Sequence, residues 1–226
     1  MRLLLLGPPG AGKGTQGKRL AAALGVPHVA AGSIIRSEIA RQSAFGRKIE
    51  AAIAQGRFAP DKDMIALLSE RLAQPDTTQG CILDGFPRDL VQAQAFDQAS
   101  DAHGLDAVLD FSLEQDVLLE RLAGRWMCPV CTQVYHLRFA PPAQAGRCDL
   151  DGAELVRRPE DDADAVQERM RIYERVTLPL RAYYAAQGVL HSLDARGSIN
   201  AVQGRILEHL QARALFPAHN AVTAPS

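Results

Sequence analysis

Lysine, aromatic residues and net charge are all scarce in this chain of 226 residues. Only four of its 25 basic residues are lysines, aromatic residues make up 5% of the chain, and 26 acidic residues balance the basic ones. Proteins that bind duplex nucleic acid or an anionic membrane through charge usually carry a basic excess, so neither is an expected partner. The hydrophobic content of 47% is too high for a disordered chain.

Long apolar runs are also missing. Residues 3–6 are leucines that follow Arg2, as at the start of a signal peptide, but glycine and two prolines end the run at once. No stretch approaches the roughly 18 apolar residues that a membrane span needs. We therefore expect a soluble, cytoplasmic and monomeric protein without a membrane partner.

Short apolar runs alternate with longer helical patterns along the chain. The expected strands are residues 3–6, 28–30, 81–83, 107–111 and 189–193. The expected helices are residues 13–24, 33–55, 62–73, 90–100, 114–123, 162–186 and 198–213. Pro179 predicts a break near Leu178 in the long helix. This alternation predicts an α/β fold with a doubly wound, parallel, five-stranded sheet whose ligand site lies at the carboxyl ends of the strands.

Two segments fit the alternation poorly and are expected to project from the sheet as inserts. Residues 31–60 are helical without a strand of their own, and residues 124–161 are rich in turn formers. The core domain is then discontinuous, made of residues 1–30, 61–123 and 162–213. Residues 214–226 carry no charged side chain, and we expect a poorly ordered tail there.

A glycine-rich loop follows the first expected strand and precedes a helix. Its sequence, GPPGAGKGT at residues 7–15, lets successive backbone N–H groups turn inward around a phosphate, and the following helix adds its positive end. The expected phosphate contacts are Gly10, Ala11, Gly12, Lys13, Gly14 and Thr15. The usual pattern has a hydroxyl residue directly after the lysine, whereas here Gly14 intervenes, so a magnesium role for Thr15 is weakened. The plain alternative is an ordinary glycine-proline turn.

A second informative segment is Asp84-Gly85-Phe86-Pro87-Arg88, with Gln92 four residues further on. Asp84 ends a strand and is placed to organise Mg²⁺, directly or through water. Arg88 can bind a second phosphate group, and a helix that begins after Pro87 would bring Gln92 onto the same face as Arg88. The two asparagines of the chain are not followed by lysine, so the guanine-reading motif of GTPase switches is absent.

These motifs, together with Tyr135-His136 and Pro141-Pro142, give the chain a resemblance to the long-lid bacterial adenylate kinases over residues 1–210. The resemblance implies a phosphate-loop core with an AMP-binding insert at 31–60 and a lid at 124–161 that closes over ATP. It also implies the reaction of ATP and AMP to two ADP with Mg²⁺.

Carried over residue by residue, the resemblance assigns three groups of residues. It places ATP on the glycine-rich loop with Lys13, Arg121 and Arg125. It places AMP beside Ala31, Arg36, Gly85, Arg88, Gln92, Arg158 and Arg169. The residues expected to act on the transferred phosphoryl group are Lys13, Asp84, Arg88, Arg125, Arg158 and Arg169. For each arginine the plain alternative is a solvated surface residue, because arginine is abundant in this chain.

The AMP site departs from the family pattern at one point. The Thr-Gly-Asp that precedes the binding helix in the family reads Ala31-Gly32-Ser33 here, so a hydroxyl that faces the nucleotide is missing. Ser33 is expected to cap the helix. The substitution at 31 bears on AMP affinity and base selectivity, and a kinase that prefers GMP, UMP or CMP is the alternative.

Three of the four cysteines lie within the expected lid. Cys128 and Cys131 form one knuckle, and Cys148 with Asp151 forms a second knuckle after 16 intervening residues. This set predicts a tetrahedral structural zinc site, as in the zinc-bearing lids of the family, and a segment of about 40 residues seldom folds without such a staple. His136 and Asp149 are rival ligands, and free thiols or a Cys128–Cys131 disulfide are alternatives. Cys81 lies in an apolar run and is expected in the core.

Two function classes other than a kinase are disfavoured. A nucleic-acid-binding zinc ribbon would carry basic and aromatic residues around its knuckles, which this composition does not favour. A regulatory nucleotide switch would not need the acceptor segment from Asp84 to Arg88.

Overall fold

The computed structural model describes residues 1–99 and 104–215. Its central sheet is formed by β1 (Arg2–Leu6), β2 (His28–Ala30), β3 (Cys81–Asp84), β4 (Ala107–Ser112) and β7 (Leu190–Asp194). The strand order is β2-β3-β1-β4-β7, and every neighbouring pair is parallel. The predicted doubly wound α/β fold with five parallel strands is confirmed.

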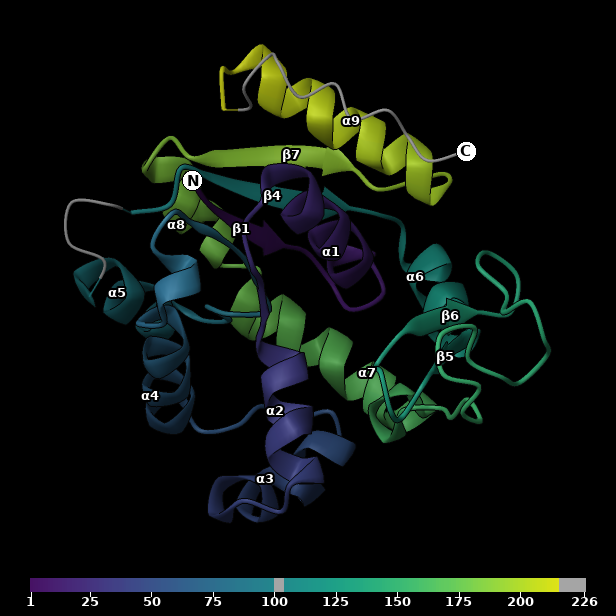
Figure 1. Cartoon of the computed structure of the whole chain (residues 1–226). Helices are drawn as coiled ribbons and strands as arrows, with labels where there is room; N and C mark the ends of the chain where they lie inside the picture. Colours follow the sequence, from purple (N-terminus) through teal and green to yellow (C-terminus); the bar gives the residue numbers. More distant parts are fainter. Residues whose placement is uncertain (100–103, 216–226) are drawn as a thin grey trace.

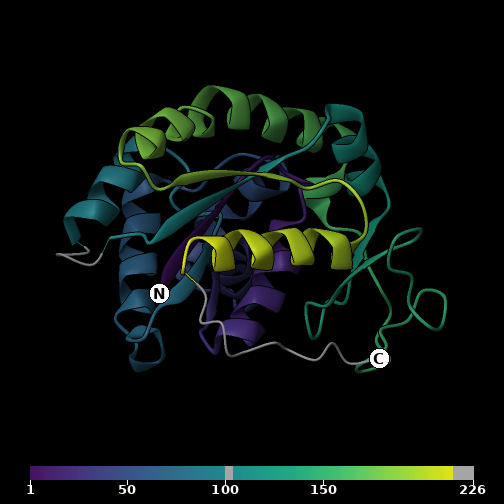
Figure 2. The same ribbon diagram turned by 90° about the horizontal axis from the view of Figure 1, so that it is seen from above.

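Helices cover both faces of this sheet (Figure 1, Figure 2). Leu3 and Leu5 of β1 share one buried core with α1 (Lys13–Leu24) and α9 (Ile199–Ala212). Leu4 and Leu6 point the other way, into a core shared with α4 (Asp61–Leu72), α5 (Leu90–Ala99) and α8 (Leu180–Ala186). Cys81 is fully buried in this second core, as predicted. The run of leucines thus contributes side chains to both hydrophobic cores, because successive side chains of a strand point to opposite faces of the sheet.

The segment between β2 and α4 forms two helices rather than the predicted single helix over 33–55. These are α2 (Ala31–Ala40) and α3 (Ala44–Ala54), which extend away from the sheet (Figure 1). The chain turns at Gln42, whose φ is +53°, and the Ser43 hydroxyl then caps α3 by accepting from the Gly46 N–H at 2.9 Å. Gly46 faces the backbone carbonyl of Glu38, where a Cβ atom would collide, so it allows the two helices to pack closely.

The expected cap at Ser33 was also wrong. Helix α2 already begins at Ala31, and Ala30 holds its N-cap position without a side-chain hydrogen bond. The Ser33 hydroxyl instead accepts a hydrogen bond from Arg36 Nη2 at 3.3 Å. Ser33 therefore orients a predicted phosphate-binding arginine.

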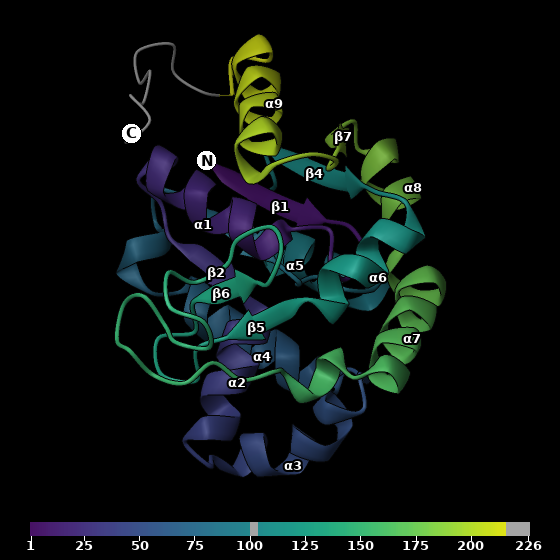
Figure 3. The same cartoon turned by 90° about the vertical axis from the view of Figure 1, so that its right-hand side faces the viewer.

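The segment between α6 (Gln115–Ala123) and α7 (Ala163–Ile172) carries a small sheet of its own (Figure 3). Strand β5 (Arg125–Met127) pairs with β6 (Val134–His136) in an antiparallel ladder, and a short 3₁₀ turn at Pro159–Asp161 leads into α7. The apolar cluster of this segment has four buried residues, against which a few partly buried side chains pack. The four are Cys128, Tyr135, Cys148 and Leu155. So small an apolar core gives little stability without further cross-links.

The helix predicted over 162–186 is interrupted as expected. Helix α7 passes into a wider π-helical turn at Tyr173–Thr177, and α8 begins after Pro179. The chain between α4 and β3 adds a 3₁₀ turn at Pro75–Thr77. The predicted tail lies mostly outside the described residues, as does Ser100. Within the part that is described, no helix combines the length and the apolar character needed to cross a membrane.

Candidate functional site

The glycine-rich loop joins β1 to α1 and approaches its neighbours too closely for side chains. Gly7 has a φ of +139°, and a Cβ atom there would lie 2.9 Å from the Phe111 carbonyl oxygen. Gly10 has a φ of +85°, and its Cβ would lie 2.9 Å from the Leu118 carbonyl oxygen. The loop is therefore held against β4 and α6, and its backbone leads into the N-terminus of α1, where anions bind.

Lys13, the first residue of α1, folds back over this loop. Its Nζ donates to the carbonyl oxygens of Gly7 at 2.7 Å and Pro8 at 2.9 Å. Burial lowers the pKa of Lys13 to about 8, with the charges of Arg169, Arg88 and Arg125 adding to the effect and Asp84 opposing it. The ammonium group is therefore buried among charges of both signs, with the Asp84 carboxylate opposing three guanidinium groups.

Asp84 lies at the carboxyl end of β3, beside the start of α1. Its Oδ2 lies 3.4 Å from Nε2 of His28, and a Cβ atom on Gly14 would lie 3.4 Å from the same oxygen. Burial alone would raise the pKa of Asp84, but the adjacent His28 ring and the charge of Lys13 outweigh it, and the pKa is lowered. An ionised carboxylate next to the phosphate loop is suited to hold Mg²⁺, directly or through water.

Arg88 follows Asp84 in the loop before α5. Its Nε donates to the Gly85 carbonyl oxygen at 2.7 Å, and its guanidinium carbon lies 4.5 Å from the centre of the Phe58 ring. Burial lowers the pKa of Arg88 to about 10, and the neighbouring charge of Arg169 contributes to the shift. The Phe58 ring offers the guanidinium an electron-rich face but no negative charge.

Asp161 joins the lid segment to α7. Its carboxylate accepts a bidentate pair of hydrogen bonds from Arg125 of β5, with Nε at 2.7 Å from Oδ2. It also accepts a hydrogen bond from Nη1 of Arg169 at 3.0 Å. The Asp161 side chain is completely buried. One carboxylate therefore holds two guanidinium groups from different elements, and the pair geometry is of the strong, charge-assisted kind.

Two further arginines lie beside this pair. Nη1 of Arg36 lies 3.5 Å from Oε1 of Glu160. Arg158 has no carboxylate within ion-pair distance among the residues described, and its Nε is 3.2 Å from the sulfur of Met127. The pKa of Arg158 is lowered to about 9. Burial is the main cause, and the positive charges of Arg125 and Arg36 add to it. A buried guanidinium without a carboxylate partner is a strong candidate to bind an anion.

The cations of this region, which we call the arginine cluster, outnumber its carboxylates. The carboxylates are those of Asp84, Glu160 and Asp161. The cations, each of which interacts electrostatically with at least one other member, are Lys13, Arg36, Arg88, Arg125, Arg158 and Arg169. Six cations therefore face three carboxylates, and the cluster is suited to a ligand that carries several negative charges.

The remaining predicted residues lie around this cluster. Arg121 of α6 donates from Nη2 to the carbonyl oxygens of Ala195 at 3.1 Å and Gly197 at 3.4 Å, next to Gly12 of the loop. Ala31 is fully buried and faces Gly85. Gln92 contacts Arg88, but not across one helix face as predicted, because α5 begins only at Leu90. Instead, the Gln92 side-chain oxygen accepts from the Arg88 N–H at 2.9 Å.

The three cysteines of the lid segment converge with Asp151. Ligand atoms of Cys128, Cys131, Cys148 and Asp151 all lie within 4.8 Å of one another. The sulfurs of Cys131 and Cys148 are 3.5 Å apart, and Oδ2 of Asp151 lies 3.2 Å from the Cys128 sulfur. Four donors around one zinc ion, with Zn–S bonds of about 2.3 Å, are separated by about 3.8 Å, so this group fits a tetrahedral metal.

The rival ligands are used elsewhere. Nδ1 of His136 accepts from the backbone N–H groups of Arg138 at 3.0 Å and Phe139 at 3.1 Å. Oδ1 of Asp149 accepts from the Ala143 N–H at 2.8 Å. Both side chains stabilise turns of the lid segment, which leaves Asp151 as the fourth donor of the group. All four cysteines are free thiols, so no disulfide competes.

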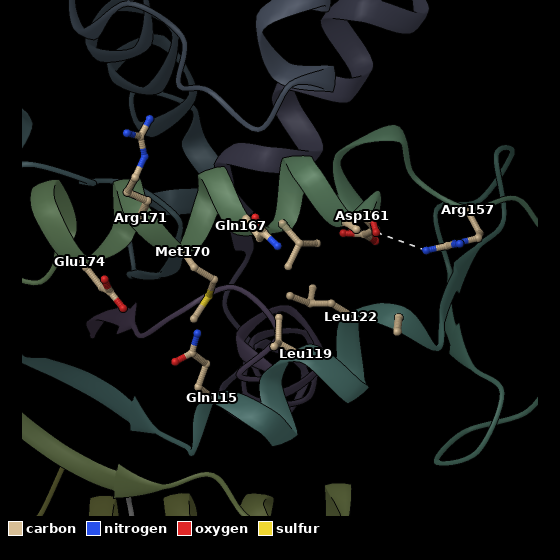
Figure 4. A pocket seen from close by; sticks show the side chains of 12 residues that line it. Gln115, Leu119, Leu122, Arg157, Asp161, Gln167, Met170, Arg171 and Glu174 are labelled. Carbon is tan, nitrogen blue, oxygen red and sulfur yellow. Dashed lines mark hydrogen bonds between the residues drawn. The ribbon is translucent and has the colours of Figure 1, made fainter.

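A groove of about 570 Å³ lies between α6 and α7, on either side of the lid segment in the sequence (Figure 4). Its apolar lining includes Leu119, Leu122, Val166 and Met170. Arg171 at its edge is already paired with Glu168 at 2.6 Å. The groove therefore lacks the cationic excess of the arginine cluster, and the charge distribution favours the cluster as a phosphate site.

Some residues of the site had no part in the sequence prediction. Glu160 and Asp161 are the counter-ions of the predicted arginines. The sequence signal for them was the run of three acids at residues 160–162, shortly after two arginines. His28 and Phe58 had no such signal, because their roles depend on contacts across the fold.

Comparison with known proteins gives a consistent result. The family model for adenylate kinase matches residues 5–189. A protein of Moorella thermoacetica named adenylate kinase is 46% identical over 204 residues, which cover 89% of this chain and 94% of that protein. Adenylate kinases of Geobacter sp. strain M21 and Streptomyces avermitilis are 43% and 40% identical over 214 residues. These cover 94% and 93% of this chain and 100% and 97% of the respective relative.

Proposed function

Because this chain belongs to the adenylate kinase family, we propose that its arginine cluster carries out the reversible Mg²⁺-dependent transfer of a phosphoryl group from ATP to AMP, which yields two ADP. The observation that supports this placement is the excess of six cations over three carboxylates around the glycine-rich loop. Two nucleotides bring several phosphate charges together, and this excess neutralises them.

The two nucleotides approach the cluster from opposite sides. ATP binds along residues 10–15 with Lys13 on its outer phosphates, and Arg121 and Arg125 complete that side. AMP binds beside Ala31 and Gly85, with Arg36 and Arg88 on its phosphate and Gln92 at its base. Arg158 and Arg169 lie between the two sides and contact phosphates of both nucleotides.

No covalent intermediate on the protein is needed for this transfer. The phosphoryl group must be held in line between donor and acceptor oxygens while cations neutralise the charge on its equatorial oxygens. Asp84 would hold the Mg²⁺, directly or through water. The ion supplies further neutralisation of the phosphates when it is bound.

Water is the competing acceptor, and we propose that the two inserts exclude it. The AMP-binding insert comprises residues 31–60 and the lid comprises residues 124–161, on a core of residues 1–30, 61–123 and 162–213. Arg125 and Arg158 belong to the lid, whereas Arg169 belongs to the core helix α7. Closure of the lid around the bound substrates would hold these two cations beside the transferred group and exclude water.

The Cys128, Cys131, Cys148 and Asp151 group holds a structural Zn²⁺ in this proposal. Three thiolates and one carboxylate fill a tetrahedral shell and leave no open position for catalysis. The ion would link the two knuckles of a segment whose apolar core has only four buried residues.

The second candidate is a kinase for a different nucleoside monophosphate, because the buried Ala31 lacks the family's hydroxyl. Both candidates are separated by measuring ADP formation from ATP with AMP, GMP, CMP or UMP as acceptor. We expect AMP to be preferred by kcat/KM. Preference for another acceptor would assign the chain to that specificity, and no turnover with any of the four would refute the proposed function. The partners are then ATP, AMP and ADP, with the chain acting as a monomer.

The lowered pKa of Lys13 predicts how ATP use depends on pH. With a pKa of about 8, Lys13 loses its proton in the free enzyme as the pH rises above 8, and a neutral amine cannot neutralise phosphate. We expect kcat/KM for ATP to fall up to about tenfold per pH unit above 8. The value of kcat at saturating ATP should fall less, because bound phosphates favour the charged amine.

The measurement is a pH profile from 6.5 to 9.5 with the fold checked by circular dichroism at each end. A kcat/KM for ATP that stays constant up to pH 9.5 would contradict this role for Lys13.

A further inference from the structure

Gln92, which we place at the base of AMP, is held at both ends of its side-chain amide. Its Oε1 accepts from the Arg88 backbone N–H at 2.9 Å, and its Nε2 donates to Oδ1 of Asp61 at 2.7 Å. Its backbone N–H also donates to Oδ1 of Asp89 at 2.8 Å, which fixes the start of α5. The Gln92 side chain is 1% exposed, so these contacts are made away from water.

The two partners of the amide allow only one orientation. A backbone N–H can only donate, and Oδ1 of Asp61 is the acceptor of the second hydrogen bond. If the amide turned over, Nε2 would meet the Arg88 N–H and Oε1 would meet the Asp61 carboxylate, so both hydrogen bonds would be lost and both contacts would be repulsive. Leaving such buried groups unpaired is costly, and the amide is therefore locked.

A locked amide distinguishes the two kinds of purine edge. At the same ring position, adenine presents a donor at its exocyclic amine and an acceptor at N1, whereas a 6-oxopurine presents an acceptor at O6 and a donor at N1. A glutamine that is free to turn can satisfy either edge by reversing its amide. One that cannot turn satisfies only one of them in a given base pose.

We propose that Asp61 is a specificity-determining residue, which locks the Gln92 amide and thereby selects adenine over 6-oxopurines in the acceptor site. This inference rests on the proposed function, in which AMP is the acceptor and Gln92 contacts its base. Asp61 does not touch the nucleotide; it is a positioning residue that acts through Gln92. The buried Ala31 offers no side-chain donor or acceptor, which leaves Gln92 a larger share of base recognition.

The first helical turn of α4 offers a matched pair of variants. Asp61 and Asp63 are both partly buried acids of that turn, but Asp63 pairs with Lys48 at 2.8 Å rather than with Gln92. Asp61→Asn replaces a pure acceptor by a group that can also donate, so it removes one of the two obstacles to reversal. Asp63→Asn makes the same change in charge on the same helix and leaves the amide locked.

The experiment compares AMP with IMP, which differs from AMP at the base edge and carries no additional 2-amino group. Diphosphate products are separated by chromatography, and kcat/KM is measured for both acceptors at saturating ATP. We expect Asp61→Asn to lower the preference for AMP over IMP by a factor on the order of ten. The preference should remain within about twofold of wild type in Asp63→Asn, and KM for ATP should be unchanged in both variants.

The outcomes separate the inference from the proposed function. If wild type prefers AMP and Asp61→Asn retains that preference, or if both variants change it equally, the role of Asp61 is overturned while the AMP assignment stands. If wild type uses neither acceptor, the proposed function itself fails. Asp61→Ser, which also offers a donor and suits the first turn of a helix, provides the same test if Asp61→Asn does not fold.

Discussion

Arg169→Ala is expected to lower kcat by a factor of about 10³ or more while the protein stays folded. Arg169 lies between the two proposed phosphate sites, and its charge depresses the pKa values of both Lys13 and Arg88. An arginine that neutralises charge on a transferred phosphoryl group contributes about 10³–10⁵ in rate in other phosphoryl transfers. The effect should fall on kcat more than on KM for either nucleotide, because the interaction strengthens in the transition state.

The fold should survive because Asp161 keeps its second partner. Arg125 remains paired with Asp161 through Nε at 2.7 Å, and the loss of Arg169 relieves repulsion among the cations.

Arg88→Ala is also expected to lower kcat strongly while the protein stays folded. Arg171→Ala is the matched control, since Arg171 is an exposed arginine of the same helix as Arg169 that pairs with Glu168. Turnover of purified, folded Arg169→Ala or Arg88→Ala at the wild-type rate would refute the catalytic role of that residue.

Removal of the metal is expected to unfold the lid and abolish transfer, with the core sheet intact. Purified without chelators, the protein should contain one zinc per chain by elemental analysis. Structural zinc contributes on the order of 10–16 kcal/mol to the folding of small peptides. Two of the four buried residues in the apolar cluster of the lid belong to the proposed metal-binding group. Cys131→Ser should lose the zinc and lower the temperature of the first unfolding transition by about 10 °C or more.

Cys81→Ala is the matched control for the metal. It removes a thiol from the core of the sheet, away from the lid, and should retain one zinc per chain. Substoichiometric zinc in the wild-type protein, or unchanged lid stability in Cys131→Ser, would overturn the structural zinc site. A loss of zinc in Cys81→Ala would show that the cysteines act through overall folding rather than as ligands.

The parallel sheet was predictable because the strands at its centre are buried on both faces. The runs at 3–6, 81–83 and 107–111 are almost uninterrupted apolar segments, and the structure places strands at all three. The lid strands that begin at Arg125 and Val134 were not predicted. Each has only three residues, and most of these are only partly buried, so no apolar run marks them.

The break between α2 and α3 shows where periodicity fails. The apolar pattern continues through residues 33–55, but the left-handed Gln42 and the capping Ser43 end one helix and begin another. Nothing in the local hydrophobic pattern marks that change, because it depends on how Gly46 packs against the preceding helix.

Cations of the site were easier to predict than their partners. The motifs around Lys13 and Arg88 gave their positions, and the family resemblance gave Arg125, Arg158 and Arg169. The structure shows which of these cations are paired with a carboxylate. Asp161 could not be distinguished from its acidic neighbours, because its burial and its pairing with Arg125, which lies far from it in the sequence, depend on the fold.

In the proposed function, Asp161 also couples nucleotide binding to the contact between the lid and α7. Its carboxylate joins Arg125 of the lid to Arg169 of α7. In the proposed function both guanidinium groups also bind phosphate, which would compete with this carboxylate for them. The free energy of that exchange is a single coupling term shared by both equilibria. A variant that strengthened the Asp161 bridge would therefore weaken phosphate binding at these two arginines by the same free energy.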